Sequence, residues 1–284
     1  MRIFNPVAIV ATLAITAALA SCGGKSETDS TSLKLEEAPA IKMTTSKDSI
    51  LKNYPGNGVL LQVYCTTELP AESRELFELI CATALRVDSV KVKELNTKNL
   101  ATFLANDIVN FPGNDSAASV SDDEKDENSG LMELPFFVNL NLTPAYNKNH
   151  ILTMCRSRVE HQSDYPPTEE YYNYNVKSCR VIDVADLFGD AEMPKLQAML
   201  KSQLLKQVND HINSHEVTED ELPAEGYWNA GNIQVNNNFS VTDAGLVWHY
   251  QPGEIAQFSK GMIHITVPFE MLEPLLLTPN PLTD

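Results

Sequence analysis

NFSVTDAGLVWHYQPGEIA, residues 238–256, is the stretch of this chain that decides its fold. Leu246, Trp248 and Tyr250 take every second position in it, which is the period of a β-strand with one apolar face. The segment 263–267, IHITV, repeats the alternation shortly afterwards. We therefore expect two neighbouring strands that present their apolar faces to a common core.

His249 and His264 lie on the opposite face of these two strands. If the strands pair, both imidazoles face solvent or a groove, and the neighbouring Glu254 completes a candidate cluster for binding a ligand or for acid–base chemistry. The simpler alternative is that the histidines are ordinary polar surface residues. In that interpretation Glu254 accepts backbone hydrogen bonds within its own loop.

No other residue pattern indicates catalysis. No Ser or Cys occurs in a nucleophile elbow, and residues 56–58, Gly-Asn-Gly, lack the spacing of a phosphate-binding loop. The acidic run at 113–130 offers carboxylate ligands, but its spacing does not match an EF-hand and such runs are usually solvated. We expect no catalytic residues, no metal and no cofactor, and therefore a protein that is not an enzyme.

Upstream of the opening stretch, predicted strands and helices come in blocks rather than in strict alternation. We expect strands at 59–63, 136–142, 151–159, 171–184, 233–235 and 239–241, a helix opening at Pro70, helices at 96–108 and 194–212, and a last short helix after Pro268. This order predicts an α+β fold of antiparallel sheets packed with helices in two successive subdomains. The N-terminal subdomain would span 51–168 and the C-terminal domain 169–284.

The N-terminus has the pattern of an export signal. Arg2 precedes an uncharged apolar run that ends in Leu19-Ala20-Ser21-Cys22, which resembles the bacterial lipobox. We expect residues 1–21 to be a signal peptide and Cys22 to carry acyl chains such as palmitate, which anchor a lipoprotein to a membrane. The alternative is ordinary signal-peptide cleavage with an unmodified Cys22. Residues 22–50 are polar and predict a disordered tether.

The chain is strongly acidic, with a formal net charge of −17. Such a protein repels nucleic acid and anionic lipid surfaces and is compatible with basic partners. Together with the leader, this places the expected lipoprotein in the envelope of a Gram-negative bacterium, at the outer membrane. It faces either the periplasm or the cell surface there, without nucleic acid as a partner.

Four cysteines remain besides Cys22, and an exported protein reaches an oxidising compartment. Cys155 and Cys179 are equally far from Pro167, so a hairpin that turns there would bring the two thiols together as a disulfide. Cys65–Cys81 is a second possible pair. The alternative is four buried free thiols that pack as small apolar groups.

The stretch 238–256, followed by Gly261 and by Val267-Pro268-Phe269, resembles the extracellular domain of RsiV-type anti-sigma factors. Residues 181–188, VIDVADLF, resemble the strand-to-helix entry of the same family, and the likeness spans about residues 135–278. This domain of unknown function also occurs in Bacteroidetes lipoproteins and beside peptidoglycan deacetylase domains.

The chain departs from the family pattern at two places. Residues 172–176, YNYNV, stand where the family often carries an aromatic-Gly-Gly-Ala-His turn, and Gly253 and Gln257 replace a usual Tyr and Pro. The resemblance therefore does not imply a ligand site at that turn.

The resemblance implies a lipid-anchored binding protein. Its ligand would be related to the cell wall or would be a basic protein such as lysozyme, which the best-known relative senses. One alternative is an accessory enzyme acting on carbohydrate or peptidoglycan through His249, Glu254 and His264. Another is a structural partner in an outer-membrane complex.

Overall fold

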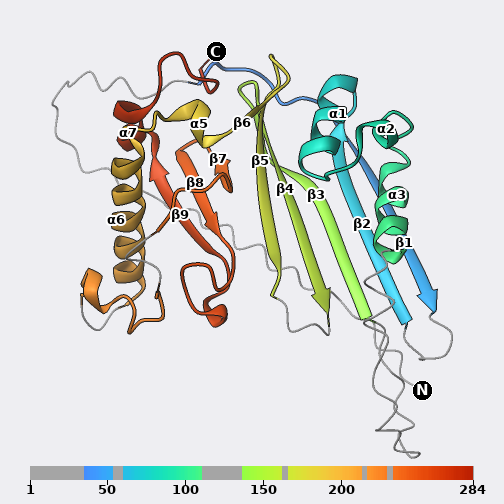
Figure 1. Cartoon of the computed structure of the whole chain (residues 1–284). Coiled ribbons are helices and arrows are strands. Elements are labelled where there is room, and N and C mark those ends of the chain that lie inside the picture. The colour runs from blue at the N-terminus through green and yellow to red at the C-terminus, as the bar shows by residue number, and fades with distance from the viewer. Residues whose placement is uncertain are drawn as a thin grey trace, which may run out of the picture. The chain divides into compact units, whose positions relative to one another are not determined.

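The computed structural model describes residues 35–53, 60–110, 136–161, 166–212, 216–228 and 233–283, and their strands form two separate sheets (Figure 1). Helices pack on each sheet, and antiparallel pairing predominates in both. The predicted α+β fold class is therefore confirmed.

The first sheet has six strands that follow the order of the chain. They are β1 (Met43–Asn53), β2 (Leu60–Pro70), β3 (Phe136–Lys148), β4 (Ile151–His161), β5 (Thr168–Asn175) and β6 (Arg180–Ile182). Only β2 and β3 pair in parallel, because the connection between them leaves the sheet, passes through helices and returns in the same direction.

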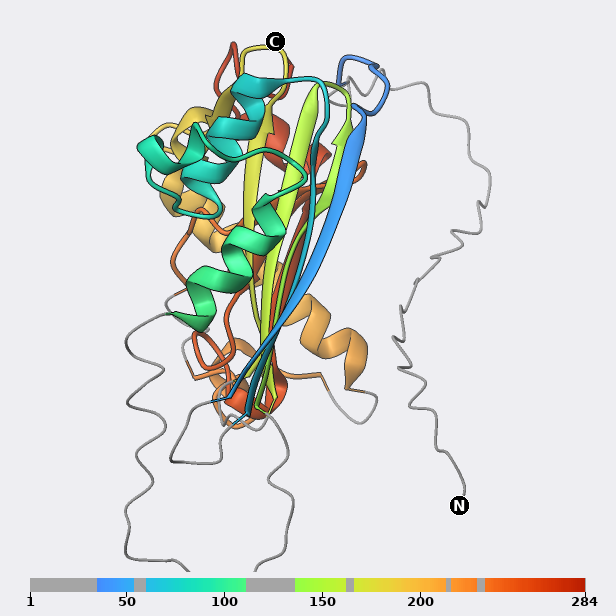
Figure 2. The ribbon, with the colours of Figure 1, turned by 90° about the vertical axis from the view of Figure 1, so that its right-hand side faces the viewer.

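Three helices from that connection cover one face of the first sheet (Figure 2). They are α1 (Arg74–Thr83), α2 (Ser89–Val92) and α3 (Leu100–Val109). Leu76 and Ile80 of α1 are fully buried, and the Ser73 hydroxyl caps this helix by accepting a hydrogen bond from the Leu76 amide. Together with inward residues of β2, β3 and β4 they form the first apolar core.

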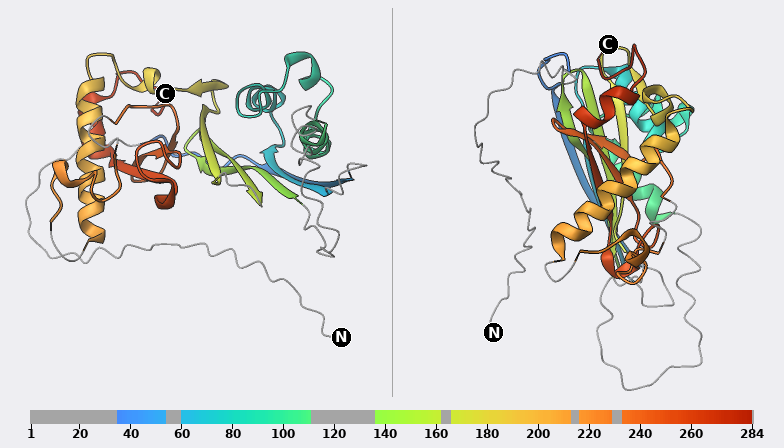
Figure 3. Two further views of the ribbon diagram at one scale, coloured as in Figure 1. Left: turned by 60° about the horizontal axis from the view of Figure 1, so that its bottom comes forward. Right: turned by 90° about the vertical axis from the view of Figure 1, so that its left-hand side faces the viewer.

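The second sheet is antiparallel and contains β7 (Phe239–Val241), β8 (Gly245–Tyr250) and β9 (Ile263–Pro268). The helix α6 (Met193–His211) lies along its side away from the first sheet (Figures 1 and 3). Every fourth residue of this helix is buried, namely Leu196, Leu200, Leu204 and Val208. They pack with the apolar face of β8 and β9, which forms the second core.

Shorter elements close the ends of this second core. They are α5 (Val184–Leu187), α7 (Phe269–Leu272) and 3-10 turns at Glu219–Glu221, Phe258–Lys260 and Glu273–Leu275. Phe188, Phe269 and Leu272 supply large buried side chains from this region.

The two sheets meet through both apolar and polar side chains. Tyr146, Ile151 and Ile182 of the first sheet are buried in the second core. Strand β7 contacts β3, β4 and β5 on the face of the first sheet that is turned away from its helices. There the buried Asn173 amide donates to the Phe239 carbonyl at 2.7 Å and accepts from the Thr153 hydroxyl at 2.7 Å. Buried polar contacts of this kind fix the position of one sheet on the other, because each buried polar group needs its specific partner.

Several predicted boundaries differ from the structure. The tether predicted for 22–50 ends too late, because Met43–Asn53 form β1. This segment is polar because β1 is an edge strand, and Met43 and Ile50 are its apolar side chains that pack partly buried against the first core. The predicted strand 171–184 divides into β5 and β6 at a turn in which Cys179 adopts a left-handed φ of 48°. Residues 233–235 form no strand.

The predicted Cys155–Cys179 disulfide is wrong. The register pairs Ile151 with Asn175 and Cys155 with Tyr171, so Cys155 and Cys179 do not face each other across the two strands. Cys179 then lies in the turn beyond β5. Among the described residues all four cysteines are free thiols, and burial raises the pKa of both Cys65 and Cys81 to about 12.

Candidate functional site

Ser240, His249 and His264 form a hydrogen-bonded chain on the face of the second sheet that is turned toward the first sheet. β8 and β9 pair as predicted and place His249 directly opposite His264, with 2.7 Å between the two Nδ1 atoms. The other ring nitrogen of His249, Nε2, is 2.8 Å from the Ser240 hydroxyl. The His249 ring also stacks on Tyr171 of β5, with ring centroids 3.7 Å apart.

Burial favours the neutral form of the two histidines. His249 is only 4% exposed, so the prediction that both histidines face solvent or a groove is wrong for this residue. Burial, with a smaller contribution from the neighbouring His264, lowers the pKa of His249 to about 3. His264 lies at the exposed edge, where partial burial lowers its pKa and the Glu169 carboxylate acts in the opposite direction. At neutral pH the pair is uncharged.

Asn238 joins the second sheet to the free edge of β5. Its Oδ1 accepts from the Tyr171 amide at 2.7 Å, and its Nδ2 donates to the carbonyls of Glu169 and His249. Gln251 Nε2 donates to the same Glu169 carbonyl at 2.6 Å. Since β6 pairs only with residues 173–175, these amides take the place of a neighbouring strand along the rest of β5.

Glu254 accepts a backbone hydrogen bond within its own loop, as the simpler of the two interpretations of the sequence predicts. One carboxylate oxygen accepts from the Gln251 amide at 2.8 Å and closes the turn that follows β8. Asn236 Nδ2 reaches the other carboxylate oxygen at 3.4 Å and the His249 carbonyl at 3.3 Å. Glu254 is therefore connected to the backbone of His249 rather than to its ring.

A groove of about 380 Å³ opens beside the contacts of Asn238 and Gln251. It lies between β5, the end of β6, the segment 236–238 and the turn after β8. Its polar lining consists of five side-chain amides (Asn173, Asn236, Asn237, Asn238 and Gln251), two tyrosines (Tyr171 and Tyr172) and three carboxylates (Glu170, Asp183 and Glu254). No Lys, Arg or His of the described residues is part of this lining.

The chemistry of this lining suits a polar ligand without negative charge. Amides both donate and accept hydrogen bonds, tyrosine rings stack on flat or cyclic groups, and carboxylates accept from hydroxyl and amine groups. Many of these side chains are already oriented by the protein. Asn237, for example, accepts from the Val184 amide at 2.8 Å and keeps its NH₂ group free of any partner in the described part of the chain.

The sequence identified part of this site. It predicted the pairing of His249 and His264 but not their contact with Ser240 and Tyr171, which depends on how the two sheets meet. The run Asn236-Asn237-Asn238 was not predicted to belong to the site. Three consecutive side-chain amides before a strand indicate a segment that forms hydrogen bonds to neighbouring backbone groups.

Other predicted features lie outside the described residues, namely Cys22 and the acidic run at 113–130. Within the described ranges no group of three His, Cys, Asp or Glu side chains is arranged to hold a metal ion. No helix in these ranges combines the length and the apolar character needed to cross a membrane.

Comparison with known proteins relates the chain to a family without an assigned function. Residues 185–270 match the model of a protein family of unknown function, DUF3298. Two crystal structures of DUF3298 family members share the fold. The Bacteroides fragilis protein has a TM-score of 0.58 at 16% identity, over 87% of this chain and 97% of the other.

The Pseudomonas aeruginosa protein has a TM-score of 0.57 at 13% identity, over 86% of this chain and 97% of its own. No curated protein matches the sequence.

Proposed function

We propose that this protein is a lipid-anchored binding protein of the bacterial envelope, and that its groove binds a glycan of the cell wall. The lining of the groove carries the proposal: amides, tyrosines and carboxylates surround a cavity without any basic side chain. Hydroxyl and N-acetyl groups of a glycan offer the matching donors and acceptors. The RsiV-type resemblance supports an envelope ligand of this class.

Binding fits the geometry better than catalysis. His249 is buried, and both of its ring nitrogens are already bonded to protein atoms. The Ser240–His249–His264 chain has the order of a nucleophile, a base and an orienting group, but Ser240 is itself only 6% exposed and does not line the groove. A nucleophile must reach its substrate, so we assign Ser240, His249 and His264 a structural role within the second sheet, which the stacking of His249 on Tyr171 connects to the first sheet.

Titration with N-acetylglucosamine trimer, followed by amide chemical shifts, tests the proposal. Asn237→Asp keeps the acceptor for the Val184 amide and removes the free NH₂ donor. Because one hydrogen bond contributes about 1 kcal/mol, binding should weaken roughly five-fold.

Asn106→Asp, the same change on the exposed surface of α3, is the matched control and should bind like the wild type. Absence of saturable binding, or equal binding by the Asn237 variant, contradicts the proposal.

A basic protein ligand is the second candidate, because the net charge of −17 and the carboxylates of the groove attract cations. The same shift experiment with lysozyme distinguishes the two. A glycan ligand perturbs the groove residues at any salt concentration. An electrostatic protein complex perturbs a wide surface and weakens steeply as salt is added.

A further inference from the structure

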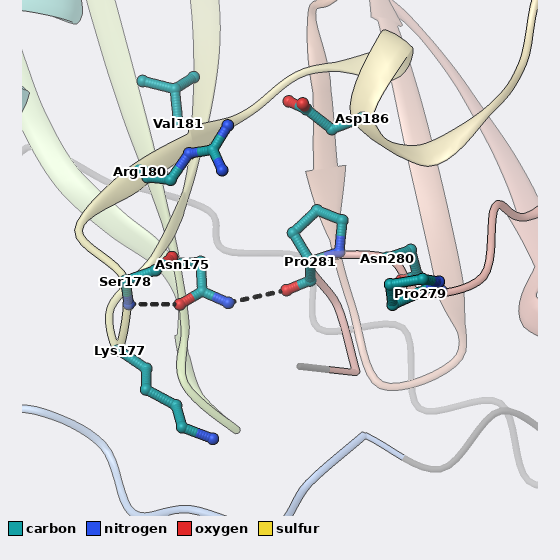
Figure 4. Close-up of a pocket in the computed structure, with 9 residues that line it drawn as sticks. All are labelled: Asn175, Lys177, Ser178, Arg180, Val181, Asp186, Pro279, Asn280 and Pro281. Carbon is teal, nitrogen blue, oxygen red and sulfur yellow. Dashed lines mark hydrogen bonds between the residues drawn. The ribbon is translucent and has the colours of Figure 1, made fainter.

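A second cavity of about 350 Å³ lies beside the groove, and its chemistry is different (Figure 4). Arg180 and Lys177 contribute two positive charges to its walls, against one carboxylate, Asp186. Pro279 and Pro281 form the opposite, less polar wall. Among the described residues the lining of the groove has no such cations, so the two cavities differ in the groups that they offer a ligand.

The second cavity continues the groove. Val181 of β6 lines both, the groove extends to Ile182 and Asp183 on one side, and the cavity includes Arg180 and Asp186 on the other. A ligand that follows β6 therefore passes from a lining without cations to one that contains Arg180 and Lys177.

Arg180 is the charged group of this cavity that remains available to a ligand. Asn175 is already bonded to the Ser178 amide and the Pro281 carbonyl, and Asp186 accepts from the Asp183 amide. Lys177 pairs with Glu36 at 3.3 Å and points away from the centre (Figure 4). Arg180 is exposed, extends toward the gap between Asp186 and Pro281, and has no hydrogen bond or ion pair to any residue that the structure describes.

We propose that this cavity binds a carboxylate of the same ligand through Arg180, so that the ligand is a glycan carrying a short peptide with a free carboxylate. This inference rests on the proposed function and specifies its substrate class. The planar guanidinium donates two parallel hydrogen bonds to a carboxylate, and the proline wall accommodates the small apolar side chains of such a peptide.

Three probes test the inference by calorimetry with the full chain: N-acetylmuramyl-L-alanyl-D-isoglutamine, the same compound with its carboxylate converted to an amide, and N-acetylglucosamine trimer. The acid should bind at least ten-fold tighter than its amide. Arg180→Gln should abolish that difference and leave binding of the trimer unchanged. Arg180→Lys should restore only part of it, because lysine keeps the charge but loses the paired donors.

Lys206→Gln on α6 lowers the net charge equally and is the control, with wild-type discrimination expected. Equal binding of acid and amide, or full discrimination by Arg180→Gln, overturns the inference. Competition by inorganic phosphate at equal strength would show that the cavity selects any anion, and would overturn the assignment of a carboxylate. If the trimer fails to bind while the acid is still preferred over its amide, the glycan proposal fails and the anion site stands.

Discussion

At the scale of single residues, His249 contacts the first sheet through one face of its ring and is held in its own sheet by both ring nitrogens. One face stacks on Tyr171, Nε2 meets the Ser240 hydroxyl and Nδ1 meets His264. Two Nδ1 atoms 2.7 Å apart need one proton between them, so at least one ring must stay in a defined tautomer. An imidazole in this position can be neutral, but protonation of both rings would place two charges in contact.

This arrangement predicts a pH-dependent stability. The folded pKa of His249, about 3, lies below the ordinary value of 6.5, so between these values the unfolded chain binds a proton that the folded chain does not. The contribution of His249 to the free energy of unfolding is therefore complete above pH 6.5 and declines as the pH falls toward 3. Its slope is at most about 1.4 kcal/mol per pH unit. Urea unfolding between pH 7.5 and 4 measures it.

His249→Phe keeps a ring on Tyr171 but cannot titrate, so this variant should be less stable at pH 7.5 and show a shallower decline on acidification. The exposed His211→Gln variant keeps His249 and should retain the wild-type slope. Equal slopes for His249→Phe and the wild type would show that another group governs the acid response.

The alternation in 246–250 and 263–267 was sufficient to predict that His249 and His264 share one face. It could not predict that His249 is buried, because a period of two residues identifies a face and not what packs on it. The partners Tyr171 and Asn238 come from a different sheet and from the residue just before β7. Such contacts depend on the docking of the two sheets, which leaves no periodic signal in the sequence.

At the scale of elements, the long helix was easier to predict than the strands. Buried leucines at every fourth position define α6 almost to the residue. The edge strand β1 was missed because only one side of it is paired and few of its residues are apolar. A glycine before a strand can serve a turn with positive φ or a close approach of two backbones, and Gly245 serves the second role, because its φ is not positive. A Cβ at this position would lie 2.1 Å from the Val267 carbonyl oxygen.

Two glycine variants separate these two roles. Gly245→Ala forces β8 away from β9, because the backbone of Val267 and Pro268 cannot yield as a flexible side chain can. We expect a loss of about 3 kcal/mol in the free energy of unfolding. Gly261→Ala meets nothing within 4 Å and bears only the backbone strain of a φ of +70° with a ψ of −152°, about 1 to 3 kcal/mol. Urea unfolding compares the two, and a larger effect at Gly261 would contradict the role given to Gly245.

At the scale of the whole molecule, the two sheets are held together by apolar residues of the second core and by polar contacts, to which Asn238 contributes three side-chain hydrogen bonds. Asn238→Asp keeps the acceptor for the Tyr171 amide but turns a carboxylate oxygen toward the carbonyls of Glu169 and His249. We expect a loss of at least about 2 kcal/mol at pH 7.5. The loss should shrink as the pH falls and the new carboxyl takes up a proton.

Asn237→Asp is the matched control for this test. It makes the same chemical change one residue earlier, at an exposed side chain whose Oδ1 acceptor is kept. Its free energy of unfolding should stay within about 0.5 kcal/mol of the wild type. Similar losses for both variants would mean that Asn238 does not join the sheets in the way proposed.

The proposed lipid anchor concerns the whole molecule, because it fixes where the groove meets its ligand. Cys22 follows Leu19-Ala20-Ser21, and acylation there would hold the protein on a membrane through about 0.8 kcal/mol for each buried methylene. Metabolic labelling with an alkyne analogue of palmitate should mark the wild-type protein in the membrane fraction. Cys22→Ala should remove the label and leave the leader uncleaved or the chain unanchored.

Cys65→Ala is the control for that experiment, because it removes a buried thiol whose pKa is raised to about 12 and which is therefore unreactive. This variant should keep both the label and the membrane location. An unlabelled wild-type chain in the soluble fraction would instead indicate ordinary cleavage of the leader. The groove would then act on free ligands, rather than on cell-wall glycan presented beside the membrane.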